Sequence, residues 1–312
     1  VIADSNKDIT GFRNVTLTGE LDAGSLDVSG DIDVDGTTNL DIVDVDGAAN
    51  FAADVTFADG ADIITASAGT SNFRAGVNAG NSIQSGGNYN TVVGDEAGTA
   101  ITTGDQNTFV GYAAGDVTTT SSNNTGIGNN ALGGNILGSY NVAIGKDSLE
   151  EMNPATAVNM YNTAVGAAAG QKVTTGTGNT LIGGLAGDAL TTGNDNVAIG
   201  KDALSADTLG SGSVAIGLVA LQDQNFTTAT NAYNTAIGRS AGRDITTGVN
   251  NVIIGALAGD ALTDADLNVA VGKGALTTDT LGSNSVAIGF AALEAQNFTT
   301  ATDSYNTAVG SA

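Results

Sequence analysis

The chain has 312 residues, of which 33 are acidic and 9 are basic, so its formal net charge is −24. This acidity repels phosphate backbones and anionic lipid headgroups, and the longest apolar runs are far too short to span a bilayer, so we expect neither nucleic-acid binding nor membrane insertion. Cys and His are both absent, which excludes disulfides, thiolate metal sites and any mechanism that uses histidine as the base.

Residues 1–75 contain short runs in which apolar side chains alternate with Asp or Thr between glycines, such as Val15 and Leu17 or Val43 and Val45. Such runs are typical of short, half-buried strands joined by tight turns. The segment has too few large side chains for a core of its own, so we expect its apolar faces to meet those of other copies. The pattern predicts an Asp-rich β fibre-shaft segment over 1–75, followed by a Gly/Asn/Ser-rich junction over 76–89.

One acidic run in this segment has the spacing of a metal site. Asp31, Asp33 and Asp35 occur in D-x-D-x-D-G, the first half of a calcium-binding loop. The twelfth position of that loop needs a bidentate Glu but is Ile42 here, and no helical pattern flanks it. The favoured interpretation is a strand whose Asp side chains face water, and calcium bound by the three Asp residues is the open alternative.

From residue 90 onward, a five-residue phrase, N-T/V-x-V/I-G, recurs thirteen times. Its steps of 17, 17, 17 and 21 residues define three 72-residue blocks, 90–161, 162–233 and 234–305. A short fixed period predicts a stacked solenoid over 90–312 rather than a globular enzyme fold. The phrase begins at Asn90, Asn107, Asn124, Asn141, Asn162, Asn179, Asn196, Ser213, Asn234, Asn251, Asn268, Ser285 and Asn306.

Each unit is expected to be one coil. The second and fourth residues of the phrase suit a strand whose Val and Ile side chains fill the coil interior. The third residue is mostly Ala, which predicts that the opposite face lies against a neighbouring chain or a tight axis. Glycines such as Gly193 should permit positive φ in the turns, and the Asn that opens each unit should tolerate the same conformation and stack into an amide ladder.

The fourth coil of each block carries four extra residues, within 150–161, 222–233 and 294–305. These inserts should bulge from one face about 19 Å apart. Their aromatic residues are candidate surface contacts for a glycan, although the favoured interpretation packs these Phe and Tyr rings against the side of the rod to fill the longer coil. The candidates are Phe226 and Phe298, with Tyr89, Tyr161, Tyr233 and Tyr305 at 72-residue spacing.

Two resemblances follow from these phrases. Residues 5–19 and the L-D-V-S-G-D-I-D-V-D-G run resemble shaft segments of tail fibres from marine bacteriophages, including cyanophages, which are intertwined trimeric β-structures. The phrases at 141–145, 196–200 and 285–289 resemble the head repeats of trimeric autotransporter adhesins, which form a left-handed parallel β-roll, and the N-T-A-V/I-G repeats of phage tail fibres. Both resemblances imply a homotrimer.

The prediction is an all-β fold: a trimeric β-solenoid preceded by an intertwined trimeric β-rich fibre segment. The expected function is the extracellular shaft of a viral tail fibre that positions a receptor-binding tip, with further copies of itself, other virion proteins and a host cell-surface glycan or protein as partners. The alternative is the passenger or stalk of a bacterial trimeric surface adhesin. Acidic residues such as Asp188, Asp195, Asp202 and Asp260 occupy ordinary turn positions, so we predict no catalytic residue, no enzyme activity and no cofactor.

Overall fold

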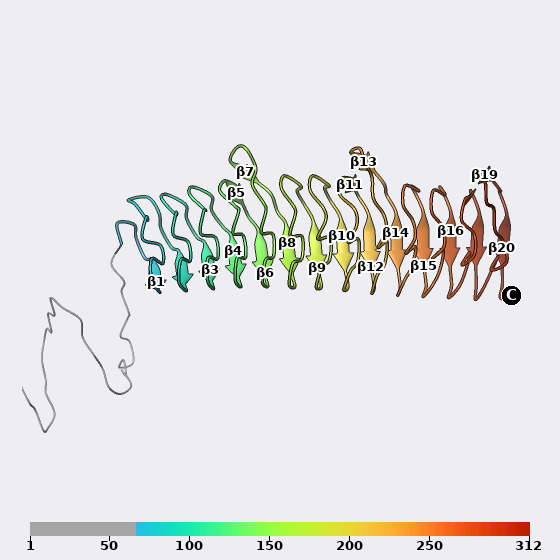
Figure 1. Ribbon diagram of the computed structural model, residues 1–312, viewed down its shortest axis with the longest axis horizontal. Helices are drawn as coiled ribbons and strands as arrows, with labels where there is room; N and C mark the ends of the chain where they lie inside the picture. The colour runs from blue at the N-terminus through green and yellow to red at the C-terminus, as the bar shows by residue number, and fades with distance from the viewer. Residues whose placement is uncertain (1–66) are drawn as a thin grey trace, which may run out of the picture. The chain divides into compact units, whose positions relative to one another are not determined.

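The computed structural model describes residues 67–312, which belong to the unit Asp62–Ala312. Within these residues the chain is all-β without a helix, and fourteen strands form one parallel sheet in chain order (Figure 1). The predicted β-solenoid of short stacked coils is confirmed. The predicted fibre segment up to residue 66, including Asp31, Asp33 and Asp35, lies outside the described residues.

Each coil contributes one three-residue strand to the main sheet, and strand residues pair with the same positions of the next coil, as in Val197 with Val214. The strands of this sheet are β1 (Phe73–Ala75), β2 (Thr91–Val93), β3 (Thr108–Val110), β4 (Thr125–Ile127), β6 (Val142–Ile144), β8 (Thr163–Val165), β9 (Thr180–Ile182), β10 (Val197–Ile199), β12 (Val214–Ile216), β14 (Thr235–Ile237), β15 (Val252–Ile254), β16 (Val269–Val271), β18 (Val286–Ile288) and β20 (Thr307–Val309).

The inserts form longer loops on one side of the stack, as predicted. Around β7 and β13 the loops extend beyond the neighbouring coils, at the end of the coil opposite the main sheet (Figure 1). Each insert returns through a two-residue strand that pairs in parallel with a two-residue strand of the preceding coil. The pairs are β5 (Gly138–Ser139) with β7 (Val158–Asn159), β11 (Gly210–Ser211) with β13 (Thr230–Asn231), and β17 (Gly282–Ser283) with β19 (Thr302–Asp303).

The solenoid begins one coil earlier than the repeat count indicates. Strand β1 pairs with β2 through Phe73 and Thr91, and Gly80 N donates to Ala97 O at 2.9 Å. Residues 76–89, predicted as a junction, therefore form the rest of this first coil. The sequence signal is weak because the phrase that opens at Asn72 keeps only its Asn and its Gly.

The strands face the opposite way from the sequence-based expectation. Ala198 is 0% exposed, whereas Val197 and Ile199 are only half-buried. The central residue of every main-sheet strand from β2 to β18 is buried in the same way. The expectation that Val and Ile fill the coil and that Ala faces outward was wrong, because a two-residue period defines two faces without saying which is inside.

The inward Ala is explained by how each coil fills its interior. Where the residue four positions after the strand's Gly is itself Gly, the strand centre can be large: a Cβ on Gly187 would lie 2.8 Å from Leu181 Cδ2. In the next coil the centre is Ala198, and Leu204 occupies the other position, fully buried. In the coil of Ala164 and Gly170 both positions are small, and Leu181 of the next coil fills the space. Its Cδ1 would lie 2.6 Å from a Cβ on Gly170. Side-chain volume is therefore shared between the two walls of the coil.

The predicted amide ladder is confirmed and starts at Asn72. Asn179 Nδ2 donates to Asn162 Oδ1 at 3.2 Å and to Gly193 O at 2.9 Å, and its Oδ1 accepts from Asn196 N at 3.0 Å. These amides are buried, so each satisfies polar groups of the coils before and after it that would otherwise be desolvated without a partner.

The turn conformations lie at other positions than predicted. The left-handed residue is the one before each ladder Asn, such as Asp195 with φ 56°, and the Asn itself is not left-handed. Gly193 does not have positive φ either. It is required by close approach instead, because a Cβ there would lie 2.2 Å from Gly210 O of the next coil.

Substituting Ala198 with Leu tests the inward orientation. The variant should lose about 1–3 kcal/mol of unfolding free energy through overpacking. Adding Leu204→Gly recreates the Leu181 and Gly187 combination of the preceding coil and should recover part of the loss. Urea unfolding, with Val197→Thr as the outward control, measures this, and an Ala198→Leu variant as stable as the wild type would contradict the orientation.

Candidate functional site

The outward side of the main sheet is a continuous uncharged surface, which we call the strand face. In each phrase of the main-sheet strands from β2 to β20, the second residue is Thr or Val and the fourth residue is Val or Ile. Five of the side chains on this face are 37–39% exposed, and they are Ile127, Ile182, Ile237, Val252 and Ile288. A contiguous apolar surface of this length on a chain of net charge −24 is typical of an interaction site.

A second feature is a buried polar network under the insert of block 162–233. Gln224 Nε2 donates to Asp207 Oδ2 at 2.6 Å and to Ser213 Oγ at 3.1 Å. Gln224 Oε1 accepts from Asn234 Nδ2 at 2.9 Å, and Asp207 Oδ1 accepts from Gly210 N at 2.9 Å. All four side chains are fully buried. Position 213 of the ladder is Ser and has no amide, and the carboxamide of Gln224 occupies that place instead.

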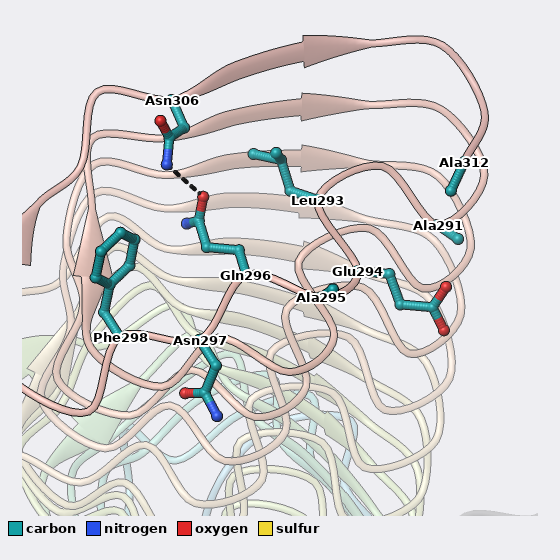
Figure 2. A pocket seen from close by; sticks show the side chains of 9 residues that line it. All are labelled: Ala291, Leu293, Glu294, Ala295, Gln296, Asn297, Phe298, Asn306 and Ala312. Carbon is teal, nitrogen blue, oxygen red and sulfur yellow. Dashed lines mark hydrogen bonds between the residues drawn. The ribbon is translucent and has the colours of Figure 1, made fainter.

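Block 234–305 repeats this network. Gln296 Nε2 donates to Asp279 Oδ2 at 2.5 Å and to Ser285 Oγ at 3.0 Å, and its Oε1 accepts from Asn306 Nδ2 at 2.8 Å (Figure 2). Block 90–161 builds the same position without a carboxylate or a glutamine. There Asn135 Nδ2 donates to Gly138 O, and Asn135 Oδ1 accepts from Gly138 N. The fully buried Met152 occupies the place of the Gln, and the Asn ladder beside it is uninterrupted.

Burial raises the pKa of Asp207 above its ordinary value of 3.8. The hydrogen bonds from Gln224 and from the backbone N–H of Gly210 oppose this rise but do not cancel it. Asp207 is therefore a carboxylate whose charge is costly in the folded chain, because a buried charge without a cation is poorly solvated.

The two insert Phe residues differ in burial. Phe226 is 5% exposed, and the coil that follows covers this region, as shown by Asn225 N donating to Thr246 O at 2.9 Å. Phe298 is half-buried beside an open hollow (Figure 2). That hollow of ≈ 670 Å³ is the end of the described stack, lined by Ala291, Leu293, Glu294, Ala295, Gln296, Asn297, Phe298, Asn306 and Ala312. Phe226 leaves little of its ring for a ligand and fills its own coil.

The four repeated Tyr residues occupy one structural position at the left-handed residue before the ladder Asn. All are exposed, at 61%, 59%, 57% and 71% for Tyr89, Tyr161, Tyr233 and Tyr305. The ring of Tyr161 lies 5.3 Å from that of Tyr140 in the preceding coil. In the coil before Tyr233, the same position is Gly212, and a Cβ on Gly212 would lie 2.8 Å from Tyr233 Cδ1. The Tyr side chains therefore lie along one edge of the strand face.

One shallow hollow brings carboxylates together. It measures ≈ 350 Å³ and is lined by Asp116, Asn130, Gly133, Gly134, Glu150 and Glu151. Burial raises the pKa of Asp116, as it does for Asp188 and Asp223. Sugar hydrolysis requires a carboxyl group of raised pKa beside another carboxylate. Here, however, Glu150 Oε2 already accepts a hydrogen bond from Gln171 Nε2 at 2.6 Å. The absence of enzyme activity stays a prediction.

Among residues 67–312, no group of three or more acidic side chains is arranged to hold a metal ion. The same part of the chain contains no helix suited to crossing a bilayer. No family model, curated protein or solved structure matches the chain. The resemblance to tail fibres and adhesin heads therefore depends on the repeat phrases, and the solenoid fold does not select between them.

Removing the buried charge should change how stability depends on pH. Because the folded-state pKa of Asp207 is raised, the native chain binds more protons than the unfolded chain between pH 3.8 and that raised value. Wild-type stability therefore falls as pH rises through this window. Asp207→Asn removes this titration, so the melting temperature of the variant relative to wild type should rise between pH 4 and neutral pH. Melting curves from pH 4 to 8, with exposed Asp264→Asn as the control, measure this; a constant difference across that range would contradict it.

Truncating Phe226 separates packing from ligand contact. Phe226→Ala should lower the unfolding free energy by about 3–5 kcal/mol because it opens a cavity inside the coil. Phe298→Ala should cost less, since that ring is half-buried. Thermal melting and cell-adhesion assays on both variants test this. Loss of adhesion without loss of melting temperature would show that the rings contact a receptor.

Proposed function

We propose that the chain forms the shaft of a homotrimeric fibre in which three copies pack their strand faces around a common axis. The observation that supports this most strongly is the strand face itself, which carries no charged side chain from β2 to β20. Burial of apolar surface contributes about 25 cal/mol per Å², so long columns of half-exposed Val and Ile supply a large driving force for association.

Charge distribution supports the same arrangement. In 90–312 the chain has 6 basic and 19 acidic residues, and none of them lies on the outward strand positions. Packing strand faces together therefore brings no acidic side chain of the strands themselves into the contact, and water screens the mutual repulsion of the exposed ones. A face exposed to water has no physical need to exclude charge.

The proposed setting is a viral tail fibre. The phrases shared with marine phage fibres support this, together with a rod that grows by uniform coils of about 4.8 Å. The shaft positions a receptor-binding tip outside the cell, contacts other virion proteins, and presents its insert loops to host cell-surface glycan or protein. Its role is structural and not catalytic.

A bacterial trimeric surface adhesin is the second candidate, supported by the same N-V-A-I-G phrases. Antibodies raised against 67–312 distinguish the two settings. Immunogold labelling of virion tails supports the fibre shaft, whereas labelling of intact bacterial surfaces in the absence of phage supports the adhesin.

The mass of the purified chain tests the assembly. Light scattering coupled to size-exclusion chromatography should give a mass near three times the 30.5 kDa of one chain. Ile182→Lys, which places a charge on the strand face, should shift the mass towards one chain while the β-sheet circular dichroism is kept. Thr192→Lys, an exposed position away from the strand face, is the matched control. A wild-type mass of one chain would refute the proposal.

A further inference from the structure

Two columns of side chains flank the strand face. The Asn-side column is the residue just before each ladder Asn or Ser, and the Gly-side column is the residue just after the Gly that ends each strand. In the coil of β10 these are Asp195 and Lys201, both exposed, at the two ends of the strand. The same positions recur in every coil from 90 onward.

The two columns differ in charge. The Asn-side column contains Asp195 as its one charged residue, and its other members are Tyr89, Gln106, Asn123, Tyr140, Tyr161, Gly178, Gly212, Tyr233, Asn250, Leu267, Asn284 and Tyr305. The Gly-side column holds four of the six basic residues of 90–312. Its members are Asp95, Tyr112, Asn129, Lys146, Ala167, Gly184, Lys201, Leu218, Arg239, Ala256, Lys273, Phe290 and Ser311.

In several coils the two columns complement each other. The one Asp of the Asn-side column shares its coil with Lys201, and Tyr233 shares its coil with Arg239. Where the Gly-side residue is the large Leu218, the Asn-side residue is Gly212. A carboxylate suits an ammonium group, and an aromatic ring suits a guanidinium group placed over its face.

Within one chain these partners cannot meet. The strand between them rises about 3.3 Å per residue, so its three residues alone hold the two columns about 10 Å apart. Lys201 instead contacts the neighbouring Asp202, and its side chain remains 65% exposed. An ammonium group has three donors, so this exposed contact leaves donors for a second carboxylate.

A ring of identical chains brings the partners together. When copies are related by rotation about an axis parallel to the solenoid, each coil meets the same coil of its neighbour, and one end of the strand meets the other end of the neighbouring strand. Such a contact is heterologous, and it closes after a fixed number of copies.

Resting on the proposed trimer, we propose that its chains lie parallel and in register, with the Asn-side column of each against the Gly-side column of the next. Asp195 then pairs with Lys201 of the partner subunit, and Tyr233 covers Arg239 of the partner subunit. The Tyr residues of the Asn-side column are part of this interface, and Tyr140 likewise faces Lys146 of the partner subunit.

Other registers lose these contacts. A shift by one coil places Asp195 against Gly184 or Leu218 of the partner subunit, and Lys201 against Gly178 or Gly212 of the partner subunit. The repeated strand face alone is nearly the same after such a shift, because every coil offers Thr or Val followed by Val or Ile. The flanking columns therefore specify the register that the strand face leaves open.

Paired cysteines test this register, since the wild-type chain contains no Cys. In the full chain carrying Asp195→Cys and Lys201→Cys, mild oxidation should convert most chains to a covalent trimer on a non-reducing gel, and reductant should return it to one chain. A disulfide needs Cα atoms about 4.4–6.8 Å apart, so only contact between subunits can form it.

Three controls fix the interpretation. Gly178→Cys with Lys201→Cys is one coil out of register and should remain uncrosslinked. Each single cysteine variant should also remain uncrosslinked, because neither column meets itself in a ring. A trimeric mass without crosslinking of the 195/201 pair, or with crosslinking of the 178/201 pair or of a single variant, overturns the register but leaves the proposed shaft standing. A monomeric mass of the wild-type chain overturns both.

Discussion

The buried amide ladder is the interaction on which the rest of the solenoid depends. Each Asn joins its coil to the coils on both sides, as Asn179 does with Asn162 and Asn196. Where Ser213 interrupts the ladder, Gln224 from the insert completes it. The insert is therefore part of the core as well as a surface loop, and its carboxamide oxygen accepts the hydrogen bond from Asn234 Nδ2 that an Asn at position 213 would accept.

The close stacking that the ladder imposes also determines the interior. Coils approach so closely that Gly193 cannot carry a Cβ, and the strand centre and the position four residues after its Gly are not both large in the same coil. Leu181 fills its coil from the strand, whereas Leu204 fills the next from the opposite wall and leaves Ala198 at the strand. Because the interior is already full, the Val and Ile of the strands lie on the outside.

That outward strand face and its flanking columns give the proposed fibre a simple division of roles. The Val and Ile columns provide the apolar surface for association, and they are alike in every coil. Register needs positions that differ between coils, and Asp195, Lys201, Gly212 and Leu218 are such positions. No acidic residue of 90–312 lies on the strand face itself, so the negative charge of these coils opposes assembly less than its size suggests.

The sequence by itself determined the period, the coil count to within one, the side of the inserts, the Tyr position and the amide ladder, because each follows from residues that recur at fixed spacing. Only the tertiary structure decided which strand face is buried, since alternation in a strand such as Val197–Ile199 is symmetric between its two faces. It also decided that Asp207 is buried and that Asn72 opens the first coil. Burial depends on contacts with adjacent coils, which a pattern read along one chain does not contain.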